Sequence, residues 1–258
     1  EFRRVLFRSK NMMKHITGKA ALLALSMVTA SAFASHWGYE GKESPEHWGE
    51  LDEAYKTCQK GMNQSPINID STLDAHLSPL QTHYIDGPVT LTNNGHTIQA
   101  SEPADTRDTI TLDKQTWTLQ QFHFHSPSEN TVHGKKYAME MHLVHKNAAG
   151  ELTVVAVMFD KGAANPELEK LWSVMPQLAE QNVSIKGDLN LNTLLPEDKT
   201  YFRFSGSLTT PPCSEGVTWI VLKHPMTVSA EQLDKFTHTM HHDNNRPVQS
   251  LHGRVVVE

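Results

Sequence analysis

The fold is decided by the stretch QFHFH at residues 121–125. Histidine and phenylalanine alternate here, and successive side chains of a β-strand point to opposite faces. His123 and His125 therefore project from one face of the predicted strand, while the two phenylalanines cover the other face. Two imidazoles on one face lie within reach of a single bound ion.

A second stretch, EMH at residues 140–142, follows after enough chain for a turn and a returning strand. The same alternation places Glu140 and His142 on a common face. One register between neighbouring strands then adds a third imidazole to His123 and His125. Three neutral nitrogen ligands leave the fourth tetrahedral position of Zn²⁺ open for water, which is typical of catalytic zinc.

The ordinary interpretation of these histidines is a hydrogen-bonded core or surface role, since the chain has 16 of them. Gln121 and Glu140 favour the zinc interpretation, because zinc-bound histidines need acceptors at their free ring nitrogens. The ordinary interpretation is kept for His15, His47, His145, His238, His241 and His242.

The N-terminal part of the chain is expected to lie outside the folded domain. The 258 residues suit one large domain. A basic segment begins at Met12, an apolar run covers residues 20–30, and a small-x-small cleavage pattern ends at Ala34, as in a secretory signal peptide. We expect a vector-derived or assembly-derived extension at residues 1–11, a signal peptide at residues 12–34 and a single domain at residues 35–258.

The predicted mature chain is acidic and exported. Without residues 1–34 its formal charge is −11, because that segment holds six of the 23 Lys/Arg and one of the 29 Asp/Glu residues. This charge argues against nucleic acid and anionic membranes as partners, and the apolar run is too short to span a bilayer. We expect a periplasmic or secreted protein. In such a compartment an even number of cysteines favours a disulfide between Cys58 and Cys213, with two buried thiols as the alternative.

Short β-type runs dominate the predicted domain. They cover residues 89–92, 97–100, 109–112, 116–125, 137–145, 152–159 and 217–223. Two helices are predicted, one after Asn165 as N-cap and Pro166 in the first turn, and one behind a capping box formed by Ser229 and Gln232. The pattern predicts a mainly β (α+β) domain with peripheral short helices.

Further motifs follow in order along the predicted domain: HWGY at 36–39, QSPINI at 64–69, NNGH at 93–96, SLTTPP at 207–212 and NNRP at 244–247. Together with the two histidine segments they resemble the α-class carbonic anhydrases of bacterial exported type. The resemblance implies a large twisted, mostly antiparallel sheet and a conical active-site cleft. It also implies reversible hydration of CO₂ to bicarbonate and a proton by attack of zinc-bound hydroxide. Cis peptide bonds at Ser65-Pro66 and Pro211-Pro212 are implied as well.

The resemblance assigns roles around the zinc. The implied ligands are His123, His125 and His142. The implied hydrogen-bond partners of these ligands are Gln121, Glu140 and the backbone carbonyl of Asn244. Thr209 is similar to the residue that accepts a hydrogen bond from the hydroxide and donates one to Glu129, which orients the attack on CO₂.

The resemblance also implies a substrate pocket and a route for the proton. An apolar molecule such as CO₂ needs an apolar patch, and the family's pocket corresponds to Val144, Val154, Leu208, Thr210, Val217 and Trp219. His96 resembles the proton shuttle, a role suited to an imidazole that titrates near neutral pH. Tyr39 and Asn94 resemble the residues that order the intervening water.

Two other interpretations remain open on the residues. One is a non-enzymatic domain of the same fold, which would lack zinc ligands, whereas all three histidines are present here. The other is an unrelated zinc hydrolase for a larger substrate. Departures from the animal members are the short segment 126–128, Gln99 at the expected rim and Asn245 after Asn244. A small-molecule substrate is expected, and a homodimer is one alternative for the oligomeric state.

Overall fold

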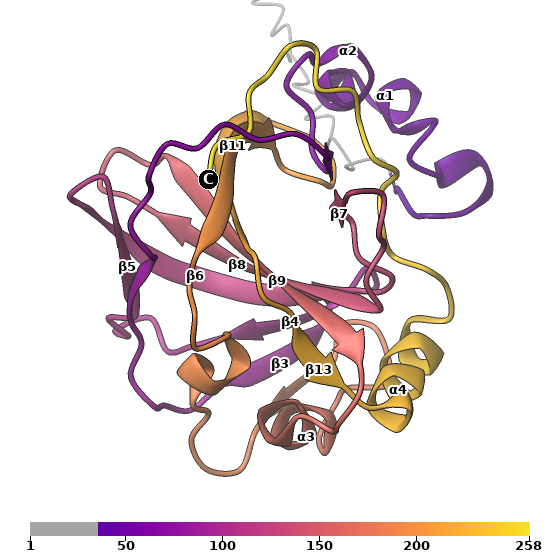
Figure 1. The fold of residues 1–258 in the computed structure, drawn as a ribbon. Helices are drawn as coiled ribbons and strands as arrows, with labels where there is room; N and C mark the ends of the chain where they lie inside the picture. Colours follow the sequence, from indigo (N-terminus) through magenta and orange to yellow (C-terminus); the bar gives the residue numbers. More distant parts are fainter. Residues whose placement is uncertain (1–35) are drawn as a thin grey trace, which may run out of the picture. The chain divides into compact units, whose positions relative to one another are not determined.

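The computed structural model describes residues 36–258, so the predicted extension and signal peptide lie outside the described residues. Strands dominate the described chain (Figure 1). They are β1 (Asn68–Ile69), β2 (Gln81–His83), β3 (Thr90–Asn93), β4 (Ile98–Ser101), β5 (Thr109–Leu112), β6 (Gln115–His125), β7 (Thr131–Val132), β8 (Met139–Lys146), β9 (Leu152–Lys161), β10 (Asn182–Ser184), β11 (Tyr201–Ser207), β12 (Glu215–Leu222) and β13 (Met226–Val228).

The helices of the described chain are short. The α-helices are α1 (Trp48–Leu51), α2 (Thr57–Lys60), α3 (Pro166–Trp172) and α4 (Ala230–Met240), and 3₁₀ turns cover Gly41–Glu43, Glu53–Tyr55 and Leu191–Leu194. Both predicted helices are confirmed with their caps. Asn165 accepts hydrogen bonds from two backbone amides of α3, and Ser229 and Gln232 form the expected capping box of α4. None of these helices has the length and apolar content needed to cross a bilayer.

One large sheet organises the domain, in the strand order β10-β3-β4-β6-β8-β9-β12-β11. Strand β5 pairs with β6 and β2, and β13 pairs with β9. Most neighbours are antiparallel, while β9 runs parallel to β12 and β13. The predicted large, mostly antiparallel sheet is confirmed.

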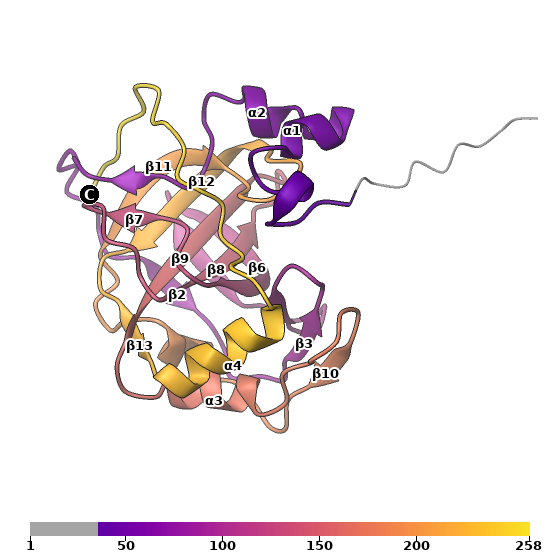
Figure 2. The ribbon, with the colours of Figure 1, turned by 90° about the vertical axis from the view of Figure 1, so that its right-hand side faces the viewer.

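The two faces of the sheet carry different cores, because side chains alternate along the central strands. On one face, Phe124 packs edge-on against Trp172 of α3 with ring centroids 4.9 Å apart. Helices α3 and α4 lie side by side on this face, as Figures 1 and 2 show from two directions. On the other face, Val144, Val154 and Trp219 belong to a second apolar cluster. His123 and His125 of β6 and His142 of β8 lie on this second face, whereas His145 of β8 lies on the first, beside Tyr84.

A predicted disulfide joins Cys58 and Cys213, which are 155 residues apart in sequence. It lies in a third, small cluster with Trp48 and Tyr55. In the chain-entropy description, closing so long a loop stabilises the folded state by at most about 5 kcal/mol. The bond attaches α2 to the loop that follows β11.

The backbone has three cis X-Pro bonds among the described residues. Those at Ser65-Pro66 and Pro211-Pro212 are as predicted, and Ser126-Pro127 is the third.

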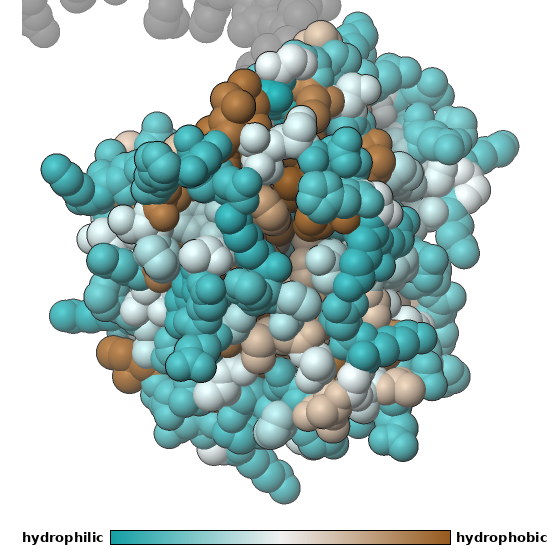
Figure 3. Space-filling view, viewed as in Figure 1, coloured by the Kyte–Doolittle hydropathy of each residue, from teal (hydrophilic) through white to brown (hydrophobic). Residues whose placement is uncertain are grey.

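The surface is mostly hydrophilic on the face drawn in Figure 3, with hydrophobic residues in small groups.

Candidate functional site

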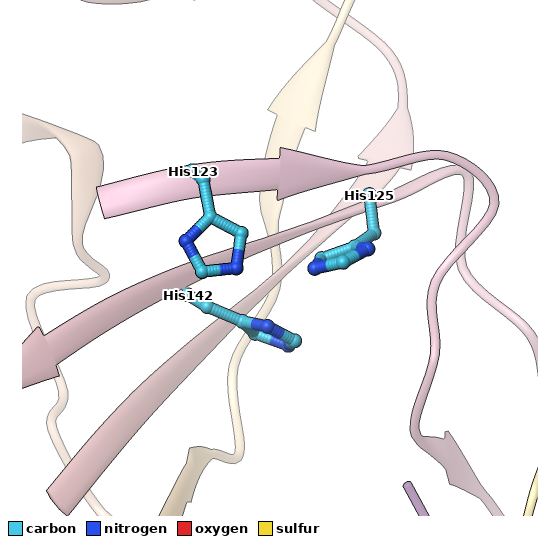
Figure 4. Close-up of side chains that lie close together, drawn as sticks. All are labelled: His123, His125 and His142. Atoms are coloured by element: carbon cyan, nitrogen blue, oxygen red, sulfur yellow. The ribbon is translucent and has the colours of Figure 1, made fainter. Parts of the chain in front are cut away.

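The register between β6 and β8 brings the three predicted ligands together. His123 lies opposite His142, and His125 lies opposite Glu140. Residues opposite each other in an antiparallel pair have side chains on the same face. The three rings turn toward one another (Figure 4), with centroids 4.6 to 5.3 Å apart. One nitrogen from each ring lies within 4.8 Å of the other two, a spacing that suits a shared metal ion.

The ring nitrogens that face away from the common point are each held by an acceptor. The contacts are His123 Nδ1 to Gln121 Oε1 at 2.8 Å, His125 Nδ1 to the Asn244 carbonyl at 2.7 Å, and His142 Nε2 to Glu140 Oε1 at 2.8 Å. A carbonyl or carboxylate oxygen only accepts, so each of these nitrogens carries the proton. The nitrogens left with a lone pair are Nε2 of His123, Nε2 of His125 and Nδ1 of His142.

The site fits zinc by its donor set and by its charge. Nε2 of His125 is buried and has no hydrogen-bond partner among the described residues. Burial lowers the pKa of His123 and of His142 well below the usual value, helped by the neighbouring imidazoles, and burial also lowers the pKa of His125. The rings are therefore neutral near pH 7, which is the form that binds a metal. Three neutral imidazoles with one open position suit Zn²⁺.

Glu140 is held by Asn130, a residue that the sequence analysis did not single out. The Asn130 side chain donates to Glu140 Oε1 at 2.7 Å. The backbone amides of Glu129 and Asn130 donate to Oε2 at 2.7 and 2.8 Å. Burial raises the pKa of Glu140, and the bonds from Asn130 oppose that rise. Three donors thus fix the carboxylate that orients His142.

Glu129 is a buried carboxyl beside the histidines. Its Oε1 accepts from the backbone amide of Arg246 at 2.9 Å, and its Oε2 has no partner of hydrogen-bonding geometry among the described residues. Burial, with a smaller contribution from Glu140, raises its pKa well above the usual value, while the Arg246 amide and the Thr209 side chain oppose the rise. Thr209 is therefore next to Glu129, as expected from the resemblance.

Arg246 connects Glu129 to the segment that contains Cys58, Gln64 and Ser65. The sequence analysis assigned Arg246 no role. Its guanidinium is buried and donates to Gln64 Oε1 and to the carbonyls of Ser65 and Cys58 at 2.8 to 2.9 Å. Burial lowers its pKa to about 10, so the group stays charged at neutral pH. The NNRP motif contained the residue, but its partners lie more than 180 residues away, beyond any local pattern.

A cavity of about 120 Å³ opens onto the histidines. Since water occupies about 30 Å³ in the liquid, this volume holds only a few small molecules. Its walls include the predicted site residues Tyr39, Asn94, His96, Gln121, His123, His125 and Thr210, together with Trp37, Thr97 and Gln99. Asn94 uses its side-chain oxygen to accept from the amides of His96 and Thr97, both at 2.9 Å, and so shapes this wall. Tyr39 presents a buried hydroxyl that has no partner among the described residues.

The predicted apolar patch lies next to His142. Val144, Val154, Leu208, Val217 and Trp219 all belong to one cluster. The ring of Trp219 meets the ring of His142 edge-on, with centroids 4.9 Å apart. Thr210 lines the cavity.

His96 is stacked on Trp37, with ring centroids 3.7 Å apart and planes 7° from parallel. Burial, and the nearby imidazoles of His36 and His242, lower its pKa to about 4. His242, for which the sequence predicted an ordinary role, packs beside Tyr39 with ring centroids 5.6 Å apart.

His145 is a core residue with both ring nitrogens hydrogen-bonded, as the sequence analysis expected. Its Nε2 bonds to the Tyr84 hydroxyl at 2.9 Å, and its Nδ1 bonds to the Leu143 carbonyl at 3.0 Å.

Comparison with known proteins finds similar chains along most of the sequence. Residues 43–258 match the family described as "Eukaryotic-type carbonic anhydrase". A carbonic anhydrase of Klebsiella pneumoniae is 71% identical over 246 residues, which cover 95% of this chain and all of that protein.

Solved structures show the same fold. The α-carbonic anhydrase of Thermovibrio ammonificans, in complex with sulfanilamide, has a TM-score of 0.84 and 48% identity, covering 87% of this chain and 99% of that chain. Dioscorin complexed with ascorbate has a TM-score of 0.81 at 30% identity, covering 86% of this chain and 97% of that chain. Dioscorin is not named as a carbonic anhydrase, yet it has this fold. The fold alone therefore does not establish a reaction, and the argument for one depends on the three histidines.

Proposed function

The chain belongs to the eukaryotic-type, or α-class, carbonic anhydrase family, and we propose that it hydrates CO₂ reversibly at a zinc ion held by His123, His125 and His142. The observation that carries the proposal is the convergence of three neutral imidazoles whose outer nitrogens are all held by acceptors. When bound there, zinc lowers the pKa of a coordinated water to about 7, a magnitude established on carbonic anhydrase itself, and so supplies a nucleophile at neutral pH.

The protein's own residues position the reactants. Glu129 is held by the Arg246 amide and lies next to Thr209, so it fixes the direction of the Thr209 hydroxyl. That hydroxyl orients the attacking oxygen, which is a positional contribution to the rate. CO₂ is apolar and is held by the patch around Val144 and Trp219 beside His142.

Bicarbonate and CO₂ are small enough for the cavity of about 120 Å³ beside the histidines.

Stopped-flow CO₂ hydration, before and after metal removal, tests the proposal. Zinc-loaded protein should be active, chelated protein should lose nearly all activity, and added zinc should restore it in proportion to the metal bound. The control is the circular dichroism spectrum of the chelated protein, which should show that the fold persists. Full activity in folded, metal-free protein would contradict the proposal.

We propose that His96 carries the proton from the site to solvent. It lines the cavity, and its partner Trp37 holds it on the wall. A ring with a pKa of about 4 takes up little proton at neutral pH, so the stacked position is the unprotonated resting position. We propose that the ring leaves Trp37 for a more solvated position when it accepts a proton.

His96→Ala should lower kcat for CO₂ hydration by about tenfold or more in dilute buffer, because proton export follows the attack on CO₂. Imidazole buffer should restore part of kcat, and kcat/KM should stay nearly unchanged. The matched control is His224→Ala, which removes an exposed histidine whose contact is an ion pair with Asp198. An equal loss of kcat and kcat/KM without buffer rescue would assign His96 to site structure instead.

We further propose that residues 12–34 direct export and that residues 35–258 form the mature domain. The Cys58–Cys213 bond supports this, because disulfides persist in oxidising compartments such as the periplasm or the extracellular space.

A further inference from the structure

Two neighbouring segments of chain form the walls of the cavity beside the histidines. One is the turn between β3 and β4, which carries Asn94, His96 and Thr97. The other is the end of β6, which carries His123 and His125. The proposed proton route crosses this cavity from the metal site to His96. Its length therefore depends on what holds the turn against β6.

The backbone pairing of β4 with β6 ends at Gln99 and His123. The next residue of β6, Phe124, bonds to a side chain of the turn instead. Its amide donates to Thr97 Oγ1 at 3.2 Å, and its carbonyl accepts from the same hydroxyl at 2.6 Å. A side chain is thus inserted between the two backbones where the ladder ends, so the turn stands off from β6 at the cavity.

Asn244 reaches the same point from a distant part of the chain, and it is fully buried. Its side-chain amide donates to the His96 carbonyl at 3.0 Å and to the Phe124 carbonyl at 2.9 Å. Its Oδ1 accepts from the Ser126 amide at 2.8 Å. Reversing the amide would set its oxygen against two carbonyl acceptors, so this orientation is the one that satisfies every group. The side chain therefore joins the backbone of His96 to β6.

The backbone of Asn244 is bonded to the metal site itself. Its carbonyl accepts from Nδ1 of His125 at 2.7 Å, and its amide donates to the Ser126 carbonyl at 3.3 Å. One buried residue thus contacts a proposed zinc ligand with its backbone and the proposed proton shuttle with its side chain. The family resemblance indicated the backbone contact, and the side-chain contacts are additional to it.

We propose that Asn244 and Thr97 are positioning residues for proton export, because their side chains together fix the separation between His96 and the metal site. This role rests on the proposed functions of His96 and of the zinc ion. Misplacement of a group by about 1 Å can cost about a hundredfold in rate. The amide of His96 is held separately by Asn94, at 2.9 Å, so loss of the Asn244 contact releases the carbonyl side of the shuttle.

Stopped-flow CO₂ hydration by the zinc-loaded protein in dilute buffer tests this role. Asn244→Asp keeps the oxygen that the Ser126 amide needs and places an acceptor against two carbonyls, so the turn should separate from β6. We expect kcat to fall by about tenfold or more, within the loss that such misplacement causes. Imidazole buffer should restore part of kcat, and kcat/KM and zinc content should stay nearly unchanged. The matched control is Asn245→Asp, which adds the same charge on a partly exposed neighbour and should behave as the parent does.

Thr97 provides a second pair of variants, without added charge. Thr97→Val keeps the shape of the side chain and removes both bonds to Phe124, so it should show the same selective loss of kcat. Thr97→Ser keeps the hydroxyl and should recover most of the parent kcat. This pair decides the question even if Asn244→Asp does not fold.

A crystal structure of Asn244→Asp gives a readout that does not depend on activity. The turn should lie farther from β6 than in the parent, with the His96 carbonyl outside bonding distance of residue 244 and with the three imidazoles in place. A turn in the parent position would contradict the proposed role.

A double variant shows whether Asn244 acts through His96. Once His96→Ala has removed the shuttle, Asn244→Asp should lower kcat little further, because residues that act together have non-additive effects. A full additional loss, or an equal loss of kcat and kcat/KM without rescue by imidazole, would leave Asn244 and Thr97 with a structural role only. An unchanged kcat in Asn244→Asp and Thr97→Val, beside a slow His96→Ala, would overturn the positioning role alone. If His96→Ala itself kept the parent kcat, the shuttle assignment would fail instead.

Discussion

His142→Ala should lose both tight zinc binding and CO₂ hydration. The substitution removes the one imidazole that β8 contributes to the site, and the two remaining imidazoles, both on β6, cannot form a three-nitrogen site. Loss of a group that merely supports a ligand costs about 10–100-fold in metal affinity or activity, and loss of the ligand itself should exceed that. Metal content by plasma emission and the rate by stopped flow are the two measurements.

Two companion variants separate the ligand from its surroundings. Glu140→Gln keeps all three ligands and changes the acceptor of His142 Nε2. Metal affinity should therefore fall by about 10–100-fold, the range expected for a group that supports a ligand. His145→Gln removes another buried histidine of β8 that bonds to Tyr84 instead, and should keep its zinc. Full metal content in His142→Ala would show that the assigned ligand set is wrong.

The centre of the fold could be predicted from sequence because it depends on local periodicity. The alternation in β6 and β8 determines which side chains share a face, and the register observed places His123 opposite His142. The caps of α3 and α4 were also predictable, because capping is a contact within three residues. The bond from His123 to Gln121 is of the same local kind.

Strand β11 was not predicted, since its stability depends on distant partners. It pairs with β12 along its length, and Phe204 stacks on Trp219 with centroids 6.0 Å apart. Gly206 weakens the local signal, yet a Cβ at that position would collide with Ser65 and Trp219. The strands β1, β2, β7, β10 and β13 have only two or three residues each, too few for a periodic pattern.

The site shows the same division between local and distant contacts. The carbonyl of Asn244 reaches His125 across 119 residues, so only the family resemblance indicated it. Asn130 and Arg246 carry no pattern that marks them as supports of the carboxylates. The low pKa of His96 depends on burial and on two imidazoles from other parts of the chain, which periodicity cannot indicate.

Thr209→Ala should lower kcat/KM for CO₂ hydration by about a hundredfold, the loss that misplacement of a reacting group by about 1 Å can cause. The hydroxyl lies next to Glu129, whose Oε1 is fixed by the Arg246 amide. Removing it takes away the group that we propose directs the attacking oxygen, and leaves the three imidazoles in place. Zinc content should therefore stay at the parent level.

Two further variants decide whether Thr209 acts through orientation. Thr209→Ser keeps the hydroxyl and should recover most of kcat/KM, whereas a role in packing alone would be lost with the methyl group. Glu129→Gln keeps the size of the side chain but can donate toward Thr209, so it should resemble Thr209→Ala in kcat/KM. We expect His96→Ala to lower kcat and spare kcat/KM, so the two steps are distinguishable in one assay. If Thr209→Ala lowered kcat alone and recovered with imidazole buffer, Thr209 would belong to proton export, and orientation of the attack would have to come from another group on the cavity wall.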